Sequence, residues 1–292
     1  LSFEIGDNDT LSAIVDKKNH PILPGRIESY DEKSECILGT FEGNPLDTYA
    51  SLLTGIGVEN VLVHGEGTID GCSDFDNWWN VELRKHDPAT RPKMLFLDKC
   101  SNVILQGITV TNSPCWNLHP FFSENLKFID LTIKSPSKSH NTDGLDPESC
   151  TNVDIIGVYF SVGDDCIAIK SGKIYMGKKY KTPSKNILIR HCYMKKGHGA
   201  VTIGSEIGAG VDGIEVRDCF FDDTDRGLRI KTRRGRGEDS VLDGIIFENI
   251  KMDHVRTPFV VNSFYYCGPD GKTEYVASKE LYPIDDRTPS VK

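Results

Sequence analysis

Short runs in which apolar and polar residues alternate recur along most of this chain. They occupy residues 58–70, 99–113, 123–135, 149–163, 184–197, 211–223 and 242–254. Each run has a turn residue, Asn or Gly, followed by alternating β-branched and polar residues, a two-residue turn and a second alternating run. A period of two residues is typical of β-strands, whose successive side chains point to opposite faces. Helical periodicity is hard to find, so the pattern predicts an all-β protein.

The turn residues recur at intervals of 23 to 42 residues, which is typical of a stacked repeat array. They are Asn60, Asn102, Asn125, Asn152, Asn186, Gly213 and Gly244. A unit of two or three short strands cannot bury its own apolar face, so it must stack on its neighbours. The sequence therefore predicts a right-handed parallel β-helix. A β-sandwich would carry more Asn-Gly or Asp-Gly hairpin turns, and a β-propeller would have repeats of more uniform length.

We expect residues 1–292 to form a single parallel β-helix domain with irregular or incomplete ends, at about residues 1–57 and 255–292. The compositions of segments 20–30 and 73–92 are those of loops or excursions from the coils. A solenoid needs polar caps at its ends. Neither end shows a clear amphipathic capping helix, which suggests that the chain is incomplete.

The cysteines agree with a stacked core in a reducing compartment. There are nine, an odd number, with neither CxxC pairs nor the Cys/His spacings of a metal site. We therefore expect reduced, buried thiols rather than a disulfide scaffold. Cys100, Cys150, Cys192 and Cys219 fall at or near equivalent places in their units, which predicts an internal ladder of small side chains.

Charge and hydropathy exclude some classes of partner. The formal net charge is −9, which argues against a general binder of polyanions such as nucleic acid. No apolar run approaches the roughly 20 residues that span a membrane, and no signal peptide is recognisable. An acidic ligand would need a local positive patch. Residues 226–237, RGLRIKTRRGRG, supply one, with five cationic side chains among eight positions.

Polar residues that a strand core would not tolerate gather in four segments. They are Asn141, Asp143 and Asp146 in 139–149, Asp164 and Asp165 in 161–172, His198 in 195–206, and Arg229 and Lys231 in 226–237. Asp164 and His198 each follow the turn residue of their unit by 12 residues. Stacked strands lie about 4.8 Å apart. We therefore expect a carboxylate, a carboxylate pair, an imidazole and a guanidinium to lie on one face of four consecutive coils.

Each of these residues also has an ordinary structural explanation. An Asp in a turn, such as Asp146, usually accepts a local backbone hydrogen bond, and a single His is usually structural. Gly197 and Gly199 on either side of His198 instead indicate close approach by backbone or a ligand. The cationic segment could be a solvated loop or contact nucleic acid, but it is a single run without nearby aromatic partners.

The combination is more specific than its parts. Neighbouring carboxyls suit acid–base hydrolysis of a glycosidic bond, because their repulsion raises one pKa and keeps one group protonated. Arginine binds carboxylates through a bidentate fork. The sequence thus predicts a hydrolase for a sugar that carries a carboxylate, with the cationic segment as the anion site.

Four short motifs then appear in order on these repeats: NTD at 141–143, GDDC at 163–166, GHG at 197–199 and RIK at 229–231. With them the chain, from about residue 50 to 265, resembles the polygalacturonases of glycoside hydrolase family 28. GEGTIDG at 65–71 and NSPCW at 112–116 also look like that family. The resemblance implies a right-handed parallel β-helix that hydrolyses α-1,4-linked galacturonan with inversion, without a metal or another cofactor.

The resemblance also implies roles for single residues. Asp164 would be the general acid, and Asp143 and Asp165 would hold and activate the water. His198 would support the protonation and contacts of the acid. Inversion by two carboxyls implies a separation of about 6.5–9.5 Å, which leaves room for water.

Substrate binding falls to other residues of the same motifs. Arg229 and Lys231 would bind a galacturonate carboxylate, and Asn141 would lie in the same cleft. Arginines 233, 234 and 236 could hold further carboxylates or could face solvent. The expected partner is an acidic pectic oligosaccharide or polysaccharide, while the oligomeric state is open.

The longer form of the cationic segment looks most like the bacterial branch, many members of which trim galacturonate from chain ends. We therefore expect exo-action and, with the reduced cysteines, a cytoplasmic location in a bacterium, with secretion as the alternative. Rival interpretations are a rhamnogalacturonan or xylogalacturonan hydrolase, a calcium-dependent pectate lyase, and a non-catalytic β-helix that binds glycans.

Overall fold

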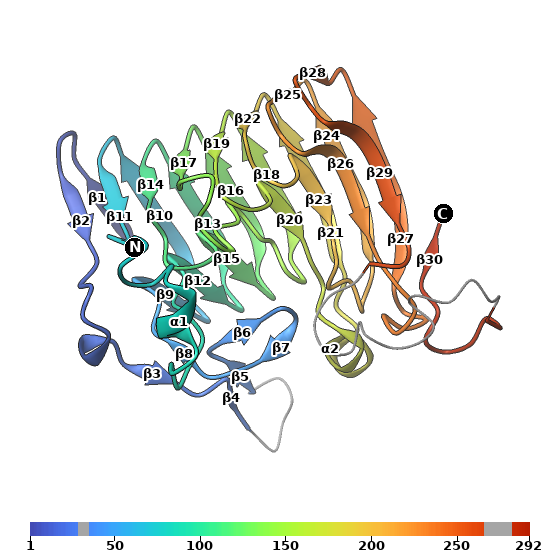
Figure 1. The fold of residues 1–292 in the computed structure, drawn as a ribbon, viewed down its shortest axis with the longest axis horizontal. Helices are drawn as coiled ribbons and strands as arrows, with labels where there is room; N and C mark the ends of the chain where they lie inside the picture. Colours follow the sequence, from blue (N-terminus) through green and yellow to red (C-terminus); the bar gives the residue numbers. More distant parts are fainter. Residues whose placement is uncertain (29–34, 266–281) are drawn as a thin grey trace.

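The chain winds into coils that stack along one axis. The computed structural model describes residues 1–28, 35–265 and 282–292. Successive coils add strands in parallel to the same faces, so the strands run side by side along the stack (Figure 1). This architecture is the right-handed parallel β-helix that the sequence predicts. Within the described residues, the helices are short and lie outside the stack: a 3-10 helix η1 (Lys17–Asn19), α1 (Val81–Arg84) and α2 (Ile174–Tyr180).

The first sheet joins β1 (Ser2–Ile5), β10 (Glu59–Gly65), β13 (Ser101–Gln106), β16 (Glu124–Ile129), β18 (Thr151–Ile156), β21 (Ser184–Arg190), β24 (Val211–Arg217), β27 (Val241–Glu248) and β30 (Ser290–Val291). The second joins β2 (Thr10–Ser12), β11 (Thr68–Asp70), β14 (Thr109–Thr111), β17 (Thr132–Lys134), β19 (Tyr159–Ser161), β22 (Tyr193–Lys195), β25 (Phe220–Asp222) and β28 (Lys251–Asp253).

The third face consists of two groups of strands. One holds β9 (Leu53–Ile56), β12 (Leu95–Asp98) and β15 (Leu118–Phe121), and the other holds β20 (Ile167–Ile169), β23 (Val201–Ile203), β26 (Arg226–Lys231) and β29 (Thr257–Asn262). Leu145 and Glu148 bridge β15 to the coil of β20, so the face is continuous.

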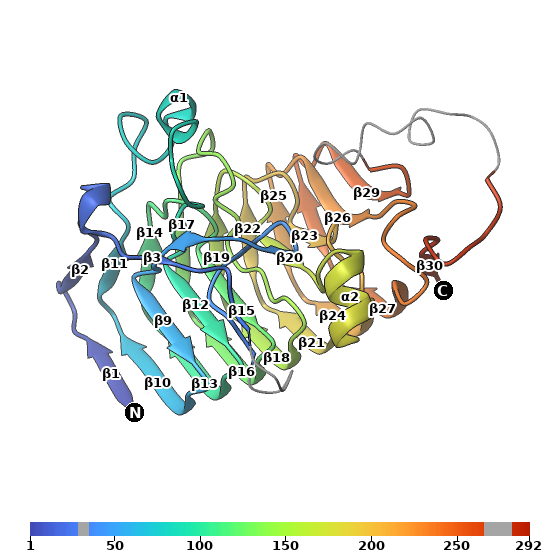
Figure 2. The same ribbon diagram turned by 90° about the horizontal axis from the view of Figure 1, so that it is seen from below.

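Three short antiparallel strand pairs lie outside the coils. They pair β3 (Ile22–Leu23) with β8 (Thr48–Tyr49), β4 (Arg26–Ile27) with β5 (Cys36–Ile37), and β6 (Thr40–Phe41) with β7 (Asn44–Pro45). Helix α1 projects away from the stack near its N-terminal end (Figure 2). The antiparallel pairs and α1 belong to stretches between strands of the coils, so they lie outside the solenoid without interrupting its strand pairing.

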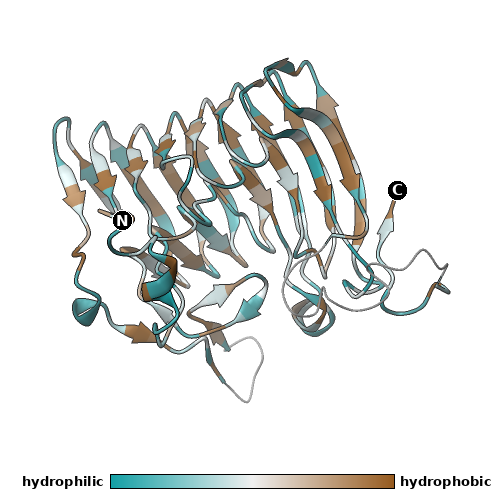
Figure 3. Ribbon diagram, viewed as in Figure 1, coloured by the Kyte–Doolittle hydropathy of each residue, from teal (hydrophilic) through white to brown (hydrophobic). Residues whose placement is uncertain are grey.

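The core consists of columns of apolar side chains, one per inward position. One column in the first sheet runs through Val63, Leu105, Phe128, Ile155, Ile189, Val216 and Phe247. A column in the second sheet runs through Leu11, Ile69, Val110, Ile133, Phe160, Met194, Phe221 and Met252. Apolar and polar residues alternate along the strands (Figure 3), which is how a narrow coil buries one face and keeps the other hydrated.

The turn residues named above form a column of their own. All seven have positive φ, from 52° to 69°. Asn and Gly tolerate this left-handed conformation best. Side chains link neighbouring coils, since Asn152 Nδ2 donates to Asn125 Oδ1 at 3.0 Å and Asn186 Nδ2 donates to Asn152 Oδ1 at 3.1 Å. The repeated Asn therefore fixes both a backbone bend and the register between coils.

Two expectations need correction. The four cysteines do not share one ladder: Cys100 and Cys150 precede strands of the first sheet, whereas Cys192 and Cys219 precede strands of the second. Unequal unit lengths blur the two corners in the sequence. The stack also begins at Ser2, within the end taken as irregular, because β1 pairs with β10 in parallel.

The cysteines nevertheless agree with the expected packing. Cys100, Cys115, Cys150, Cys166, Cys192 and Cys219 are buried free thiols. In the part of the chain that the structure describes, no helix has the length and apolar character needed to cross a membrane.

The left-handed column gives a stability prediction. Replacing Asn152 by Val should lower the free energy of unfolding by about 2 kcal/mol, because a β-branched residue is strained at positive φ and both ladder hydrogen bonds are lost. Asn152→Gly loses the same hydrogen bonds but accepts the backbone, so it should cost less than about 1 kcal/mol. Urea unfolding followed by circular dichroism measures both. Equal midpoints for the two variants would show that backbone strain is not the constraint.

Candidate active site

The predicted site residues gather on the outer side of the third face. Ile167 of β20 pairs with Val201 of β23, and Asp164 and His198 each lie three residues before them. The expectation that these two residues share a register is therefore confirmed. Strand β26 follows β23 in the same sheet, so Arg229 and Lys231 lie two coils beyond the strand that follows Asp165.

Three carboxyl groups form the centre of the site. Asp143, Asp164 and Asp165 each place an oxygen within 4.8 Å of the others. The first and last are buried, whereas the Asp164 side chain keeps 21% of its surface exposed. These oxygens lie closer together than the roughly 6.5–9.5 Å expected between the two carboxyl groups of an inverting enzyme. Asp164 and Asp165 are neighbours on one coil and Asp143 lies on the adjacent coil, so strand spacing brings the three groups together.

The two buried carboxyls have opposite electrostatic surroundings. Burial and the neighbouring charges of Asp164 and Asp146 raise the pKa of Asp143 well above its usual range. Burial would also raise the pKa of Asp165, but Lys231 and Arg229 outweigh it and hold that pKa at about 2. Asp143 therefore favours its protonated form, whereas Asp165 carries a fixed negative charge.

The cations reach Asp165 across two coils. Lys231 Nζ donates to Asp165 Oδ2 at 2.8 Å, and Arg229 Nη1 donates to Asp165 Oδ1 at 3.2 Å. Both oxygens of this buried carboxylate are thus occupied by charged donors. The predicted anion-binding pair is bound to a carboxylate of the protein itself.

His198 contacts the exposed member of the cluster. Its Nδ1 lies 3.2 Å from Asp164 Oδ1, and that hydrogen bond raises the pKa of the imidazole. A Cβ on Gly197 would lie 2.7 Å from the backbone oxygen of Asp164, and one on Gly199 would lie 2.7 Å from Asp165 Oδ1. The close approach that the flanking glycines indicated is therefore confirmed: it is the approach of backbone to the carboxyl pair.

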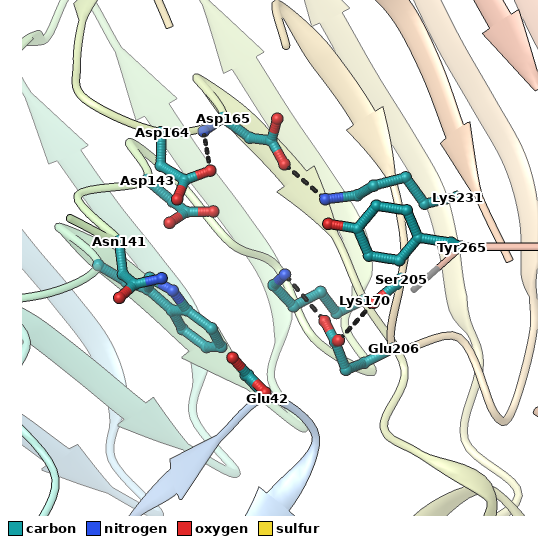
Figure 4. Close-up of a pocket in the computed structure, with 11 residues that line it drawn as sticks. Glu42, Asn141, Asp143, Asp164, Asp165, Lys170, Ser205, Glu206, Lys231 and Tyr265 are labelled. Carbon is teal, nitrogen blue, oxygen red and sulfur yellow. Dashed lines mark hydrogen bonds and ion pairs between the residues drawn. The ribbon is translucent and has the colours of Figure 1, made fainter. Parts of the chain in front are cut away.

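A pocket opens over this cluster (Figure 4). It is lined by Glu42, Trp116, Asn141, Asp143, Asp164, Asp165, Lys170, Ser205, Glu206, Lys231 and Tyr265. Sequence reasoning identified five of these and missed the rest. Lys170 was detectable, because it shares the register of Lys231 and lies in the same segment as Asp164. Glu42 gave no such signal, since it comes from a hairpin outside the repeats.

The floor of the pocket is a buried ion-pair network. Lys170 Nζ donates to Glu206 Oε2 at 3.1 Å and lies 3.9 Å from Asp146, which is fully buried rather than a turn residue. Burial opposes the charged form of Lys170, but Glu206 and Asp146 outweigh it and raise its pKa. Arg236 is also buried and donates to Ser205 Oγ at 3.1 Å.

The remaining cations of the cationic segment, residues 226–237, stabilise the fold. Arg233 is buried, and Arg234 forms an ion pair with Asp285. With Arg236 committed to the pocket floor, none of the three extends the anion site into solvent. The acidic chain therefore concentrates positive charge here largely to compensate carboxylates that it buries itself.

The hairpin that supplies Glu42 is held firmly against the coils. Glu42 and Gly43 form its two-residue turn with φ of 49° and 73°, and Lys173 N donates to Gly43 O at 3.2 Å. Phe41 stacks on Trp116 with ring centroids 5.6 Å apart. Figure 1 shows this hairpin and α2 below the coils. The hairpin is thus a fixed wall of the pocket.

A cation could be considered at the carboxyl cluster, since Asp143, Asp164 and Asp165 meet the distance condition for a metal site. Oxygen-rich sites of this kind suit Mg²⁺ or Ca²⁺. Both oxygens of Asp165, however, already accept hydrogen bonds from Arg229 and Lys231. The residues therefore fit a metal ion poorly, and its absence from the reaction stays a prediction.

The raised pKa of Asp143 predicts a stability change with a definite pH dependence. A carboxyl whose pKa is raised on folding favours the folded state below its unfolded pKa, and this contribution is lost as pH rises through the folded value. Asp143→Asn, which mimics the protonated form, should therefore raise the urea midpoint at pH 7 but not near pH 3.5. Asp154→Asn, which removes a partly exposed carboxylate that pairs with Lys127, is the control. An equal effect at both pH values would contradict the assignment.

The chain is similar to known proteins over most of its length. The family model of glycosyl hydrolases family 28 matches residues 39–279. A probable polygalacturonase of Vitis vinifera is 36% identical over 70% of this chain and 42% of its own. An endo-polygalacturonase of Pectobacterium carotovorum subsp. carotovorum is 33% identical over 91% of this chain and 63% of its own.

A solved structure, that of a hyperthermoactive exopolygalacturonase from Thermotoga maritima, is 28% identical with a TM-score of 0.69 and covers 86% of this chain and 63% of that chain. The chain thus spans less than two thirds of the length of these proteins. Because the family model covers residues 39–279, which include all the predicted site residues, the chain belongs to glycosyl hydrolase family 28.

Proposed function

We propose that this chain hydrolyses α-1,4-linked galacturonan by inverting acid–base catalysis. The observation that carries the proposal is the cluster of Asp143, Asp164 and Asp165, in which one buried carboxyl retains a proton and another is held ionised by two cations. Such a division of protonation states is what acid–base cleavage of a glycosidic bond requires. The polygalacturonases among the relatives support the substrate class.

Asp164 is the proposed general acid. It is the exposed member of the cluster, and two neighbouring carboxyls and His198 surround it. The proton that Asp143 retains moves to Asp164 and then passes to the glycosidic oxygen while the bond from that oxygen to the anomeric carbon breaks. A water held by Asp143 and Asp165 attacks the carbon from the opposite side. Asp143, ionised by the loss of its proton to Asp164, accepts the proton that the water releases, which restores the starting state of the cluster.

Arg229 and Lys231 contribute by fixing the charge of Asp165 and by facing the carboxylate of the bound sugar. Tyr265 covers both, with its ring centroid 5.6 Å from the guanidinium carbon and 5.1 Å from the ammonium nitrogen. Substitution of either cation would therefore lower turnover as well as weaken binding, because it would remove one of the two charges that compensate the buried carboxylate of Asp165.

Exo-action and a cytoplasmic location in a bacterium are finer parts of the proposal. The similarity to the Thermotoga exopolygalacturonase supports release of sugars from chain ends, while the Pectobacterium relative is an endo-polygalacturonase. Six buried free thiols suit a reducing compartment. The products of a defined oligomer distinguish exo- from endo-action directly.

Incubation with tetragalacturonate should release saturated monogalacturonate from the outset, with the β-anomer formed first in proton NMR spectra. The rate should not change after treatment with EDTA. A ladder of shorter oligomers would establish endo-action. First formation of the α-anomer would mean retention, which the short distance between the nearest carboxyl oxygens would allow. Rising absorbance at 235 nm with sensitivity to EDTA would establish a lyase and overturn the mechanism.

Asp164→Asn should lower kcat by about 10²–10⁴-fold, because a positioned acid contributes that much to the rate. Its urea midpoint should stay close to that of the wild type, since Asp164 is partly exposed. Asp154→Asn removes a partly exposed carboxylate of β18 that lies outside the pocket, and it should keep full activity. Near-normal turnover of the Asp164 variant would remove Asp164 from the mechanism.

A further inference from the structure

The pocket over the carboxyl cluster offers little free positive charge for an acidic sugar chain. It is lined by five acidic side chains, Glu42, Asp143, Asp164, Asp165 and Glu206, and by two lysines. Each lysine is already paired, Lys231 with Asp165 at 2.8 Å and Lys170 with Glu206 at 3.1 Å. A chain that carries one carboxylate per sugar needs cations that the protein has not neutralised.

A second pocket adjoins the first and differs from it in charge. It is lined by Phe41, Glu42, Arg84, Asp87, Ala89, Thr90, Arg91 and Asn141. Glu42 and Asn141 line both pockets. A ligand that extends from the carboxyl cluster past these two residues therefore enters a space that contains two guanidinium groups.

Arg84, the last residue of α1, supplies the first guanidinium. Its Nε is buried and has no hydrogen-bond partner in the described part of the chain. Asp87 in the same pocket favours the charged form of Arg84 only weakly, since both Asp87 oxygens accept from Lys17 Nζ, at 2.7 and 2.8 Å. Burial and the charge of Arg91 lower the pKa of Arg84 from its usual value, so an anion placed here would relieve both effects.

Arg91 supplies the second guanidinium, and its partners are neutral. Its Nη1 donates to the backbone oxygens of Pro114 and His140 at 2.7 and 2.9 Å, and its Nη2 donates to Asn141 Oδ1 at 2.7 Å. These contacts fix the side chain without cancelling its charge. Arg91 is 6% exposed, and a buried charge with only neutral partners attracts an anion more strongly than a hydrated one.

We propose that Arg84 and Arg91 form a second carboxylate-binding subsite. It holds a galacturonate unit that lies nearer the N-terminal end of the solenoid than the bond that is cleaved. This inference rests on the proposed function for the identity of the ligand. Asn141, fixed by Arg91, links the subsite to the carboxyl cluster. Glu42 faces both pockets, and burial and Glu206 raise its pKa, which reduces its repulsion of a passing carboxylate.

The test is binding of oligogalacturonates by titration calorimetry to chains that carry Asp164→Asn, so that the ligand is not cleaved. Adding Arg84→Gln should weaken binding of hexagalacturonate by about 5- to 50-fold, the contribution expected of a charge-assisted hydrogen bond. Added salt should reduce the difference. Adding Arg190→Gln, which removes an exposed arginine from the end of β21, should leave the affinity unchanged.

A neutral ligand and a length series make the result specific. Fully methyl-esterified hexagalacturonate should bind equally to the Arg84 and Arg190 variants, because it carries no carboxylate. Across oligomers of two to six sugars, the Arg84 effect should appear at one length and persist at greater lengths. Equal affinities of the two variants at every length would overturn the subsite.

The subsite and the proposed function fail in different ways. If the wild-type chain cleaves tetragalacturonate but Arg84→Gln matches Arg190→Gln in kcat/KM and in binding, the subsite is wrong and the hydrolase stands. If the wild-type chain cleaves nothing but Arg84→Gln still weakens binding, the subsite stands and the chain is a binding protein. Equal urea midpoints for the two variants show that neither effect comes from unfolding.

Discussion

Parallel, in-register pairing between coils is the constraint on which the rest of this structure depends. Each strand pairs with the equivalent strand of the next coil, so every position in the repeat becomes a column along the axis. Inward columns are apolar and form the core. The Asn column of positive φ holds the coils in step. Asp164 and His198 lie just before strands of the third face, and Arg229 lies on one of them. The same pairing that builds the core therefore also assembles the site.

This dependence explains how much could be predicted from the sequence. The fold and the shared register of Asp164 and His198 follow from counting residues from the Asn of each unit. In a solenoid, residues at the same distance from the turn residue occupy equivalent positions in neighbouring coils. Counting failed where units differ in length or where a residue lies outside the repeats. Cys100 and Cys192 lie at different corners of units whose lengths differ, and Glu42 comes from a hairpin between β5 and β8 that belongs to no repeat. Arg84 lies on an excursion for the same reason, and contacts of excursions depend on packing that no periodicity encodes.

Electrostatics adds a second layer that residue types alone do not reveal. The cationic segment at 226–237 looks like an anion site, yet Arg229, Lys231 and Arg236 mainly compensate Asp165 and Glu206, which the fold buries. Among the residues that the structure describes, Arg84 and Arg91 have no such carboxylate partners, although nothing in their local sequence distinguishes them. The difference lies in which charges are neutralised, and that is determined by distances between segments far apart in the chain.

The reach of Arg229 and Lys231 across two coils has a consequence for how such a site can change. Strands cannot slide without breaking the pairing, so the axial position of a functional group can change only in whole increments of about 4.8 Å. Finer adjustment must come from side-chain length. Aspartates on one coil and long cations two coils away form hydrogen bonds of 2.8 and 3.2 Å because their lengths match the increment. In this scaffold, exchanging Asp for Glu or Lys for Arg therefore changes the distance that an ion pair can bridge, and it is not a conservative replacement.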